Sequence, residues 1–216
     1  MLMPLNRFLN LPNEEKERVL GISKVQFAIN GYDATSLNLL LKELGISKGQ
    51  FYYWFEDKAD LFFTVMQEGL DALRLLLDEH GHPTSATDYW GHMRESKLIT
   101  ERFWDDNGFV EIGQMVSQQI PPNHPIYERL VVCSAPLQSH FREDLRLGQK
   151  WGLVRTDLSI EILQVLTDGV SDAFYQPMLQ TYTKGKPPTE ETMLLHDLLG
   201  RTLRVILRPV EEDEMN

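Results

Sequence analysis

The 216-residue chain has little cysteine, no long apolar run and a shortage of positive charge. A single cysteine, Cys133, excludes an intrachain disulfide and fits a reducing compartment. No run approaches the roughly eighteen apolar residues of a membrane span. The N-terminus also lacks the charged segment, long apolar stretch and cleavage site of a secretion signal. We therefore expect a cytoplasmic protein with no membrane partner.

Positive charge is scarce and unevenly placed. The chain has 21 basic and 32 acidic residues, a net charge of −11. Residues 1–60 hold 7 basic and 8 acidic residues, so nearly all of the excess negative charge falls on the remainder. Charge alone does not indicate a nucleic-acid partner. A near-neutral N-terminal part can nevertheless face phosphates while an acidic remainder is repelled.

Alternating apolar patterns typical of strands are absent, and one segment after another has helical spacing. We expect helices at residues 13–30, 37–44, 48–55, 58–80, 85–103, 109–119, 125–149, 160–181 and 190–207. The sequence therefore predicts an all-α fold in two domains. A three-helix head occupies residues 12–56, and a helical body for effector binding and dimerisation occupies residues 57–208. The first body helix, residues 57–80, links the two.

Two of the expected helices have the spacing of a helix-turn-helix. Thr35 or Ser36 supplies an N-cap hydroxyl for the first one. Gly45 suits the left-handed residue that ends a helix, and Ser47 can cap the second helix two residues later. One apolar stripe precedes the turn: Leu37, Leu40, Leu41 and Leu44. Two short helices joined by such a turn are typical of DNA-binding proteins.

The second helix of the pair indicates which face would contact DNA. Phe51 and Phe55 are four residues apart and should pack against the leucines. The residues expected to point away from that core are Gly49, Gln50, Tyr53 and Trp54. Gln50 suits a base edge, while Lys48 suits a phosphate at the start of the helix. Lys58 could reach the DNA backbone again.

The segment from Thr35 to Leu61 resembles the DNA-binding part of the tetracycline-repressor (TetR) family. The shared pattern is T-[ST], a ten-residue helix, G-[VI]-S-K-G, an aromatic run ending in Phe, and a Lys and an acid before Leu-Phe. The resemblance implies a bacterial transcriptional repressor that binds operator DNA and is released by a small-molecule effector. It implies backbone contacts from Ser36, Asn38, Tyr52 and Lys58. It implies base-side contacts from Lys48, Gly49, Gln50, Tyr53 and Trp54.

Two other functions compete with this one. Gly45-Ile46-Ser47-Lys48-Gly49 matches G-x-S-x-G, which would make Ser47 the nucleophile of a small-molecule serine hydrolase. That motif requires a strand before the serine, whereas the preceding residues have helical spacing. A helical scaffold that binds protein through Tyr53 and Trp54 is a further alternative. We favour the capping serine and a protein that is not an enzyme.

The body is expected to dimerise and to hold the effector. Residues 159–207 carry more apolar side chains than one small body buries, which favours a homodimer over closure of the monomer's own core. The resemblance also implies an apolar effector pocket, although each aromatic or methionine by itself is better explained as core. Its candidate residues are Trp90, Phe103, Trp104, Phe109, Met115, Phe141, Phe174 and Met178.

The spacing of the histidines does not predict a metal site. His80, His82 and His92 match no structural-zinc spacing, and no cysteine lies near them in the sequence. Asp105 and Asp106 resemble a turn cluster rather than a catalytic pair, because nothing nearby would separate their pKa values. We therefore expect no metal, no cofactor and no catalytic residues.

Overall fold

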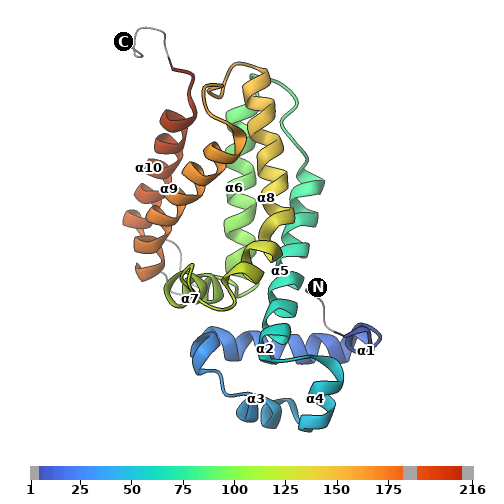
Figure 1. The fold of residues 1–216 in the computed structure, drawn as a ribbon. Helices are drawn as coiled ribbons and strands as arrows, with labels where there is room; N and C mark the ends of the chain where they lie inside the picture. The colour runs from blue at the N-terminus through green and yellow to red at the C-terminus, as the bar shows by residue number, and fades with distance from the viewer. Residues whose placement is uncertain (1–4, 182–188, 211–216) are drawn as a thin grey trace. The chain divides into compact units, whose positions relative to one another are not determined.

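A computed structural model describes residues 5–181 and 189–210, with some side chains of α7 and α9 left out (Figure 1). All regular structure in these residues is helical, as predicted. None of these helices is both long and apolar enough to cross a membrane. The helices are α1 (Asn6–Leu9), α2 (Asn13–Ala34), α3 (Leu37–Leu44), α4 (Lys48–Trp54), α5 (Lys58–His80), α6 (Tyr89–Asp106), α7 (Val110–Gln119), α8 (Tyr127–Lys150), α9 (Ile160–Thr181) and α10 (Glu190–Leu207).

The chain divides into two compact units. Unit 1 comprises residues 1–74 and 104–137, and unit 2 comprises residues 75–103 and 138–216. The division passes through α5, α6 and α8, so each of these helices contributes residues to both units. A head that ends at residue 56 stays a prediction.

Unit 1 is built around α2, which contacts α3 and α7. Its regular helical path breaks at Gly31, whose φ of 76° favours glycine. The sequence placed the helix end at this glycine. Buried apolar side chains from several helices fill the unit, among them Phe8, Val19, Phe27, Leu40, Leu44, Phe51, Phe55 and Phe62. Short α1, which the sequence did not predict, contributes Phe8 to this core.

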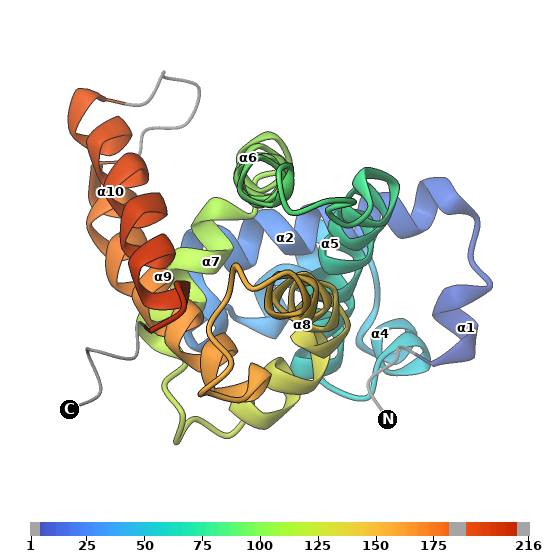
Figure 2. The same ribbon diagram turned by 90° about the horizontal axis from the view of Figure 1, so that it is seen from above.

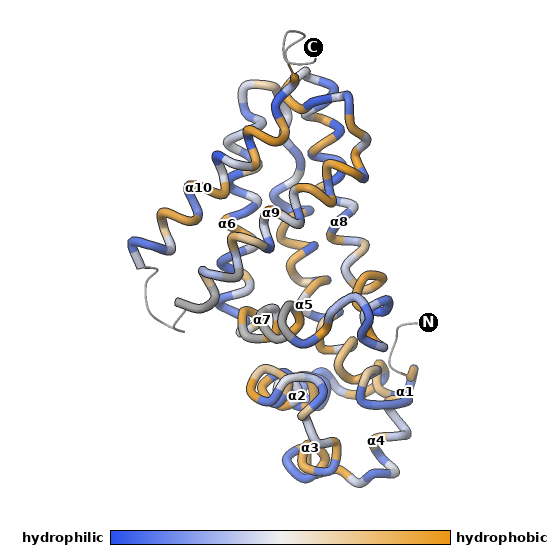
Figure 3. The backbone as a smooth tube through the Cα atoms, turned by 60° about the vertical axis from the view of Figure 1, so that its left-hand side comes forward, coloured by the Kyte–Doolittle hydropathy of each residue, from blue (hydrophilic) through white to orange (hydrophobic). Residues whose placement is uncertain are grey.

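In unit 2, α9 and α10 lie side by side (Figures 1 and 2). The Thr189 hydroxyl caps α10 by accepting a hydrogen bond from the Thr192 N–H, as expected. Apolar residues recur along both helices (Figure 3). Their mutual contact nevertheless leaves a set of large apolar side chains exposed: Ile162, Val165, Leu166, Met193, Leu194, Leu198 and Val205.

Candidate DNA-binding interface

The connection between α3 and α4 has the geometry of a helix-turn-helix. Gly45 adopts φ 65° and ψ 27°, the left-handed conformation that ends α3. Arg18 on α2 donates a hydrogen bond of 2.7 Å to the Leu44 carbonyl oxygen at the same helix end. The Ser47 hydroxyl accepts a hydrogen bond of 3.1 Å from the Gln50 N–H. The predicted roles of Gly45 and Ser47 are confirmed.

The same geometry leaves the hydrolase alternative without support. A nucleophile elbow places its serine between a strand and a helix. Ser47 follows α3, a helix, and its hydroxyl is used as a cap. No strand is present among residues 5–181 and 189–210 to provide the sheet of such an enzyme.

The expected hydroxyl cap of α3 is wrong. Ser36 occupies the N-cap position, but its side chain makes no capping hydrogen bond. Thr35 is buried, and its hydroxyl donates to the Gly31 carbonyl oxygen on α2. Ser36 is therefore left exposed at the start of α3, where its hydroxyl is accessible to a partner.

Trp54 corrects the predicted outward face of α4. Phe51 and Phe55 are fully buried, as expected, but Trp54 is also only 3% exposed. Its ring meets the Phe8 ring edge-to-face at 6.1 Å, and its carbonyl oxygen accepts a hydrogen bond from the Leu5 N–H. The expectation that Trp54 faces DNA is wrong, because α1 covers the side of α4 that carries it.

The other residues predicted on or beside α3 and α4 are all exposed, and together they are called the DNA-binding surface here. Its members are Ser36, Asn38, Lys48, Gly49, Gln50, Tyr52 and Tyr53. Tyr52 and Tyr53 are 46% and 53% exposed. The Arg7 guanidinium lies 4.3 Å from the centre of the Tyr53 ring, so α1 adds a cation to this surface. Sequence reasoning missed Arg7, because α1 is too short to have a readable period.

Lys58 has a different environment from Lys48. Its ammonium donates hydrogen bonds to the carbonyl oxygens of Tyr32 (2.7 Å), Asp33 (3.2 Å) and Thr35 (3.2 Å) at the end of α2. Burial lowers the pKa of Lys58. Lys58 thus ties the start of α5 to the end of α2. The ammonium that the family resemblance assigns to a DNA phosphate is therefore already surrounded by three carbonyl oxygens.

The eight candidate pocket residues are distributed over both units. Trp104, Phe109 and Met115 belong to unit 1, and the side chain of Met115 lies outside the described residues. Phe109 is buried against Gly69, so it serves as core. Phe103 and Met178 are buried in unit 2, where Phe141 and Phe174 are half-buried. Trp90 is a lining residue of a shallow surface depression of about 380 Å³ in unit 2, beside Leu153 and Arg204.

Unit 2 also contains a polar cluster that the sequence did not reveal. The Glu101 carboxylate on α6 accepts hydrogen bonds from the Tyr175 hydroxyl (3.1 Å) and pairs with His196 Nδ1 (3.0 Å) and Lys97 Nζ (3.5 Å). Burial would raise the pKa of Glu101, but these partners hold it below its ordinary value. The side chains come from α6, α9 and α10, so no local sequence pattern joins them.

Comparison with known proteins agrees with the helix-turn-helix geometry of α3 and α4. Residues 23–65 match the family model "Bacterial regulatory proteins, tetR family". The chain is 24% identical over 190 residues to the HTH-type transcriptional repressor Rv1474c of Mycobacterium tuberculosis, covering 88% of this chain and 92% of the relative. It is 23% identical over 163 residues to the repressor AcnR of Corynebacterium glutamicum, covering 76% and 81%.

A solved structure described as a TetR-family transcriptional regulator from Syntrophomonas wolfei has the same fold. The TM-score is 0.70, the identity is 19%, and the match covers 89% of this chain and 96% of that one. The matched family segment contains the whole of α3, the turn and α4. Residues 23–65 therefore form the DNA-binding segment typical of the tetR family of bacterial regulatory proteins, and the chain is a DNA-binding transcriptional regulator.

Proposed function

We propose that the chain is a cytoplasmic, homodimeric repressor that binds operator DNA through α4 and is released by a small molecule bound in unit 2. The observation that supports DNA recognition most strongly is the exposed face of α4. That helix buries Phe51 and Trp54 but leaves Gln50, Tyr52 and Tyr53 at the surface. A short helix with such a face suits the major groove.

The exposed residues divide by chemistry into two kinds of contact. Gln50 and Tyr53 carry hydrogen-bonding groups suited to base edges, and Gly49 between Lys48 and Gln50 permits close approach of the backbone. The groups suited to phosphates are the side chains of Arg7, Ser36, Asn38, Lys48 and Tyr52. We leave Trp54 out because it is buried, and Lys58 because three carbonyl oxygens already surround its ammonium.

Dimerisation is proposed through α9 and α10, within residues 159–207. The two helices contact each other and still expose seven large apolar side chains, with Val165 on α9 at 71% and Val205 on α10 at 61%. Large exposed apolar surfaces favour protein contacts. A second copy supplies the same surface, and pairing through a two-fold axis gives two reading helices for two half-sites.

The effector is proposed to bind in unit 2 near the Glu101 cluster. A half-buried carboxylate with a tyrosine, a lysine and a histidine around it offers hydrogen bonds to a polar small molecule. If the effector is a cation, Glu101 is a better candidate to bind it than Glu95 or Glu128, because both of these are exposed. The side chain of Glu111 lies outside the described residues. Helix α5 runs unbroken from Lys58 to His80, which supports a coupling through this helix to the DNA-binding face.

Two measurements test the proposal. Sedimentation equilibrium of the full chain with a duplex that it binds should give two chains per duplex. A monomer at micromolar concentration, or tight binding of one chain to a single half-site, would contradict the dimer. For the effector, calorimetry with and without saturating DNA should show that DNA weakens effector binding by about 1–3 kcal/mol, the same amount by which the effector weakens DNA binding. Identical affinities would mean that the ligand does not regulate DNA binding.

A further inference from the structure

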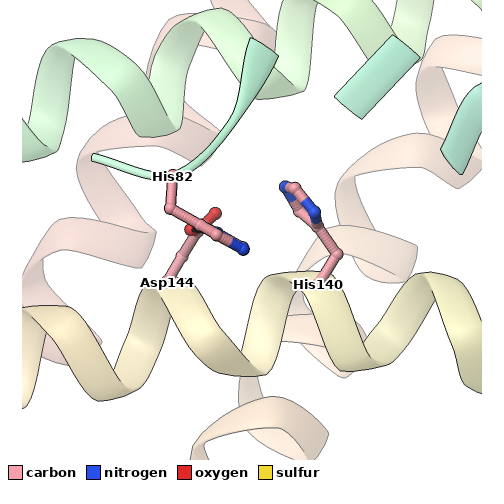
Figure 4. Close-up of side chains that lie close together, drawn as sticks. All are labelled: His82, His140 and Asp144. Carbon is pink, nitrogen blue, oxygen red and sulfur yellow. Dashed lines mark hydrogen bonds and ion pairs between the residues drawn. The ribbon is translucent and has the colours of Figure 1, made fainter. Parts of the chain in front are cut away.

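Four of the six histidines in the chain meet in unit 2. His80 ends α5, His82 lies in the following connection, His92 is on α6 and His140 is on α8. Their rings stack in pairs, His80 with His92 at 4.2 Å and His82 with His140 at 4.4 Å between centres. The carboxylate of Asp144, one turn after His140 on α8, lies beside His82 and His140 (Figure 4).

Three of these side chains have the geometry of a ligand set. One donor atom each from His82, His140 and Asp144 lies within 4.8 Å of the other two. Figure 4 shows His140 and Asp144 projecting from the same face of α8 toward the connection that carries His82. No other group of this kind is present among the described residues.

The hydrogen bonds of the cluster are incomplete. His82 Nδ1 lies 2.6 Å from Asp144 Oδ1, but the Asp144 side chain is fully buried and its Oδ2 has no partner. His140 is also buried, and its Nε2 has no partner. A buried polar atom left unsatisfied costs about 1–3 kcal/mol. An ordinary His–Asp pair explains the 2.6 Å contact, but it does not explain why Asp144 Oδ2 and His140 Nε2 are buried without a partner.

We propose that His82, His140 and Asp144 bind a divalent transition-metal ion, with Zn²⁺ the best fit. Two imidazoles and one carboxylate are a ligand set that zinc uses, with a fourth position left open. Mg²⁺ and Ca²⁺ prefer oxygen ligands throughout. The site is independent of the proposed DNA contacts and of the Glu101 cluster.

The surroundings of His140 fit its role as a ligand. Its Nδ1 lies 3.4 Å from Asp78 Oδ1, so the ring can donate there and keep the lone pair of Nε2 for the ion. His80 Nε2 and His92 Nε2 are likewise buried without partners, but these residues are not part of the three-residue ligand group.

Binding requires small movements of the ligand side chains, because their donor atoms lie within 4.8 Å of one another and the ion needs them closer. Metal–ligand bonds of about 2.0–2.2 Å place neighbouring ligand atoms roughly 3.0–3.5 Å apart, so His82 must withdraw from Asp144 by less than about 1 Å. The His82 side chain is 38% exposed and its backbone lies outside any helix, so it is free to make this shift. The bound ion would join the α5–α6 connection to α8 within unit 2.

The test is metal binding by the full-length, untagged chain after treatment with a chelator. Zn²⁺ titration by calorimetry should give one ion per chain, and Co²⁺ should give the visible absorption of a tetrahedral or five-coordinate site. His82→Gln and Asp144→Asn should each weaken Zn²⁺ binding by more than the ~10–100-fold typical of losing a supporting residue. Asp78→Asn should weaken it within that range.

His124→Gln is the matched control. His124 lies in unit 1, where it pairs with Asp33, so this variant should bind Zn²⁺ like the unaltered chain. Circular dichroism checks folding; if Asp144→Asn unfolds, the half-exposed His82→Gln variant decides the matter. Equal Zn²⁺ affinity in the unaltered chain and His82→Gln, or an equal loss in the control, would overturn the proposal.

Discussion

Lys48 and Lys58 provide the sharpest test of the DNA-binding surface, because the structure gives them different roles. The Lys58 ammonium has three carbonyl partners at 2.7–3.2 Å, whereas the interaction described for Lys48 is with the Tyr52 ring at 6.0 Å. Replacing each lysine by methionine keeps the aliphatic stem and removes only the ammonium. Lys58→Met should lower the stability of the fold, and Lys48→Met should weaken DNA binding.

The magnitudes follow from these contacts. Hydrogen bonds to a charged group contribute about 1.5–3 kcal/mol, and water can replace part of this at the half-buried Lys58. We expect Lys58→Met to lower the free energy of unfolding by about 1–2 kcal/mol. For a chain of this length each kcal/mol corresponds to a Tm change of about 2–4 °C. Lys48→Met should change stability by less than about 0.5 kcal/mol.

The DNA assay should give the opposite order. Each phosphate contact adds about 0.9 to the slope of log affinity against log salt concentration. Anisotropy titrations over a range of salt concentrations should show that slope reduced by about 0.9 for Lys48→Met and unchanged for Lys58→Met. A Lys58→Met variant with normal Tm and a flattened salt slope would refute the reasoning and make Lys58 a phosphate contact, as the family resemblance implies.

Four further outcomes are expected. Gly69→Ala should destabilise the chain by at least about 1–3 kcal/mol in thermal unfolding, because the new Cβ would lie 2.3 Å from the Phe109 ring. A Cβ at Gly49 would have no neighbour closer than 3.8 Å, so Gly49→Ala should leave the Tm unchanged or raise it. The same variant should weaken DNA binding, because the new methyl group would keep the backbone away from the DNA. A normal DNA affinity would show that close approach at Gly49 is not needed. Val165→Arg should shift the sedimentation of the chain toward the monomer, while the control Val25→Arg, at the exposed valine of α2, should not. A Val165→Arg chain that remains dimeric would exclude this interface. Glu101→Gln should destabilise at pH 7. Since partners hold the Glu101 pKa below its ordinary 4.5, that difference should vanish as pH falls below this value; a pH-independent difference would contradict the ion-pair account.

The helix-turn-helix was predictable because its signals are local. The leucine stripe, Gly45 and Ser47 each act within one or two turns of their own helix, and the structure places Gly45 and Ser47 as expected. Trp54 was misplaced because its burial depends on α1, a four-residue helix more than forty positions earlier. A helix this short has no measurable period, so the sequence did not show that it covers α4.

The histidine cluster and the Glu101 cluster of unit 2 could not be predicted from local sequence patterns, because their members come from different helices. His80, His82 and His92 alone match no zinc spacing, and no sequence pattern places His140 and Asp144 of α8 beside His82. Glu101 likewise meets partners from α9 and α10, about 74 or more positions later. Such sites depend on how helices pack, which periodicity does not specify.

The most direct test of the central claim is selection of bound duplexes from a randomised DNA pool by the full-length chain. The account predicts enrichment of a pseudo-palindrome whose half-site centres lie one or more helical turns apart, ~34 Å or a multiple. Gln50→Ala and Tyr53→Ala should each narrow the preference for that sequence over random DNA by about 1–3 kcal/mol. Failure to enrich any sequence, or the same preference retained by both variants, would contradict recognition through α4.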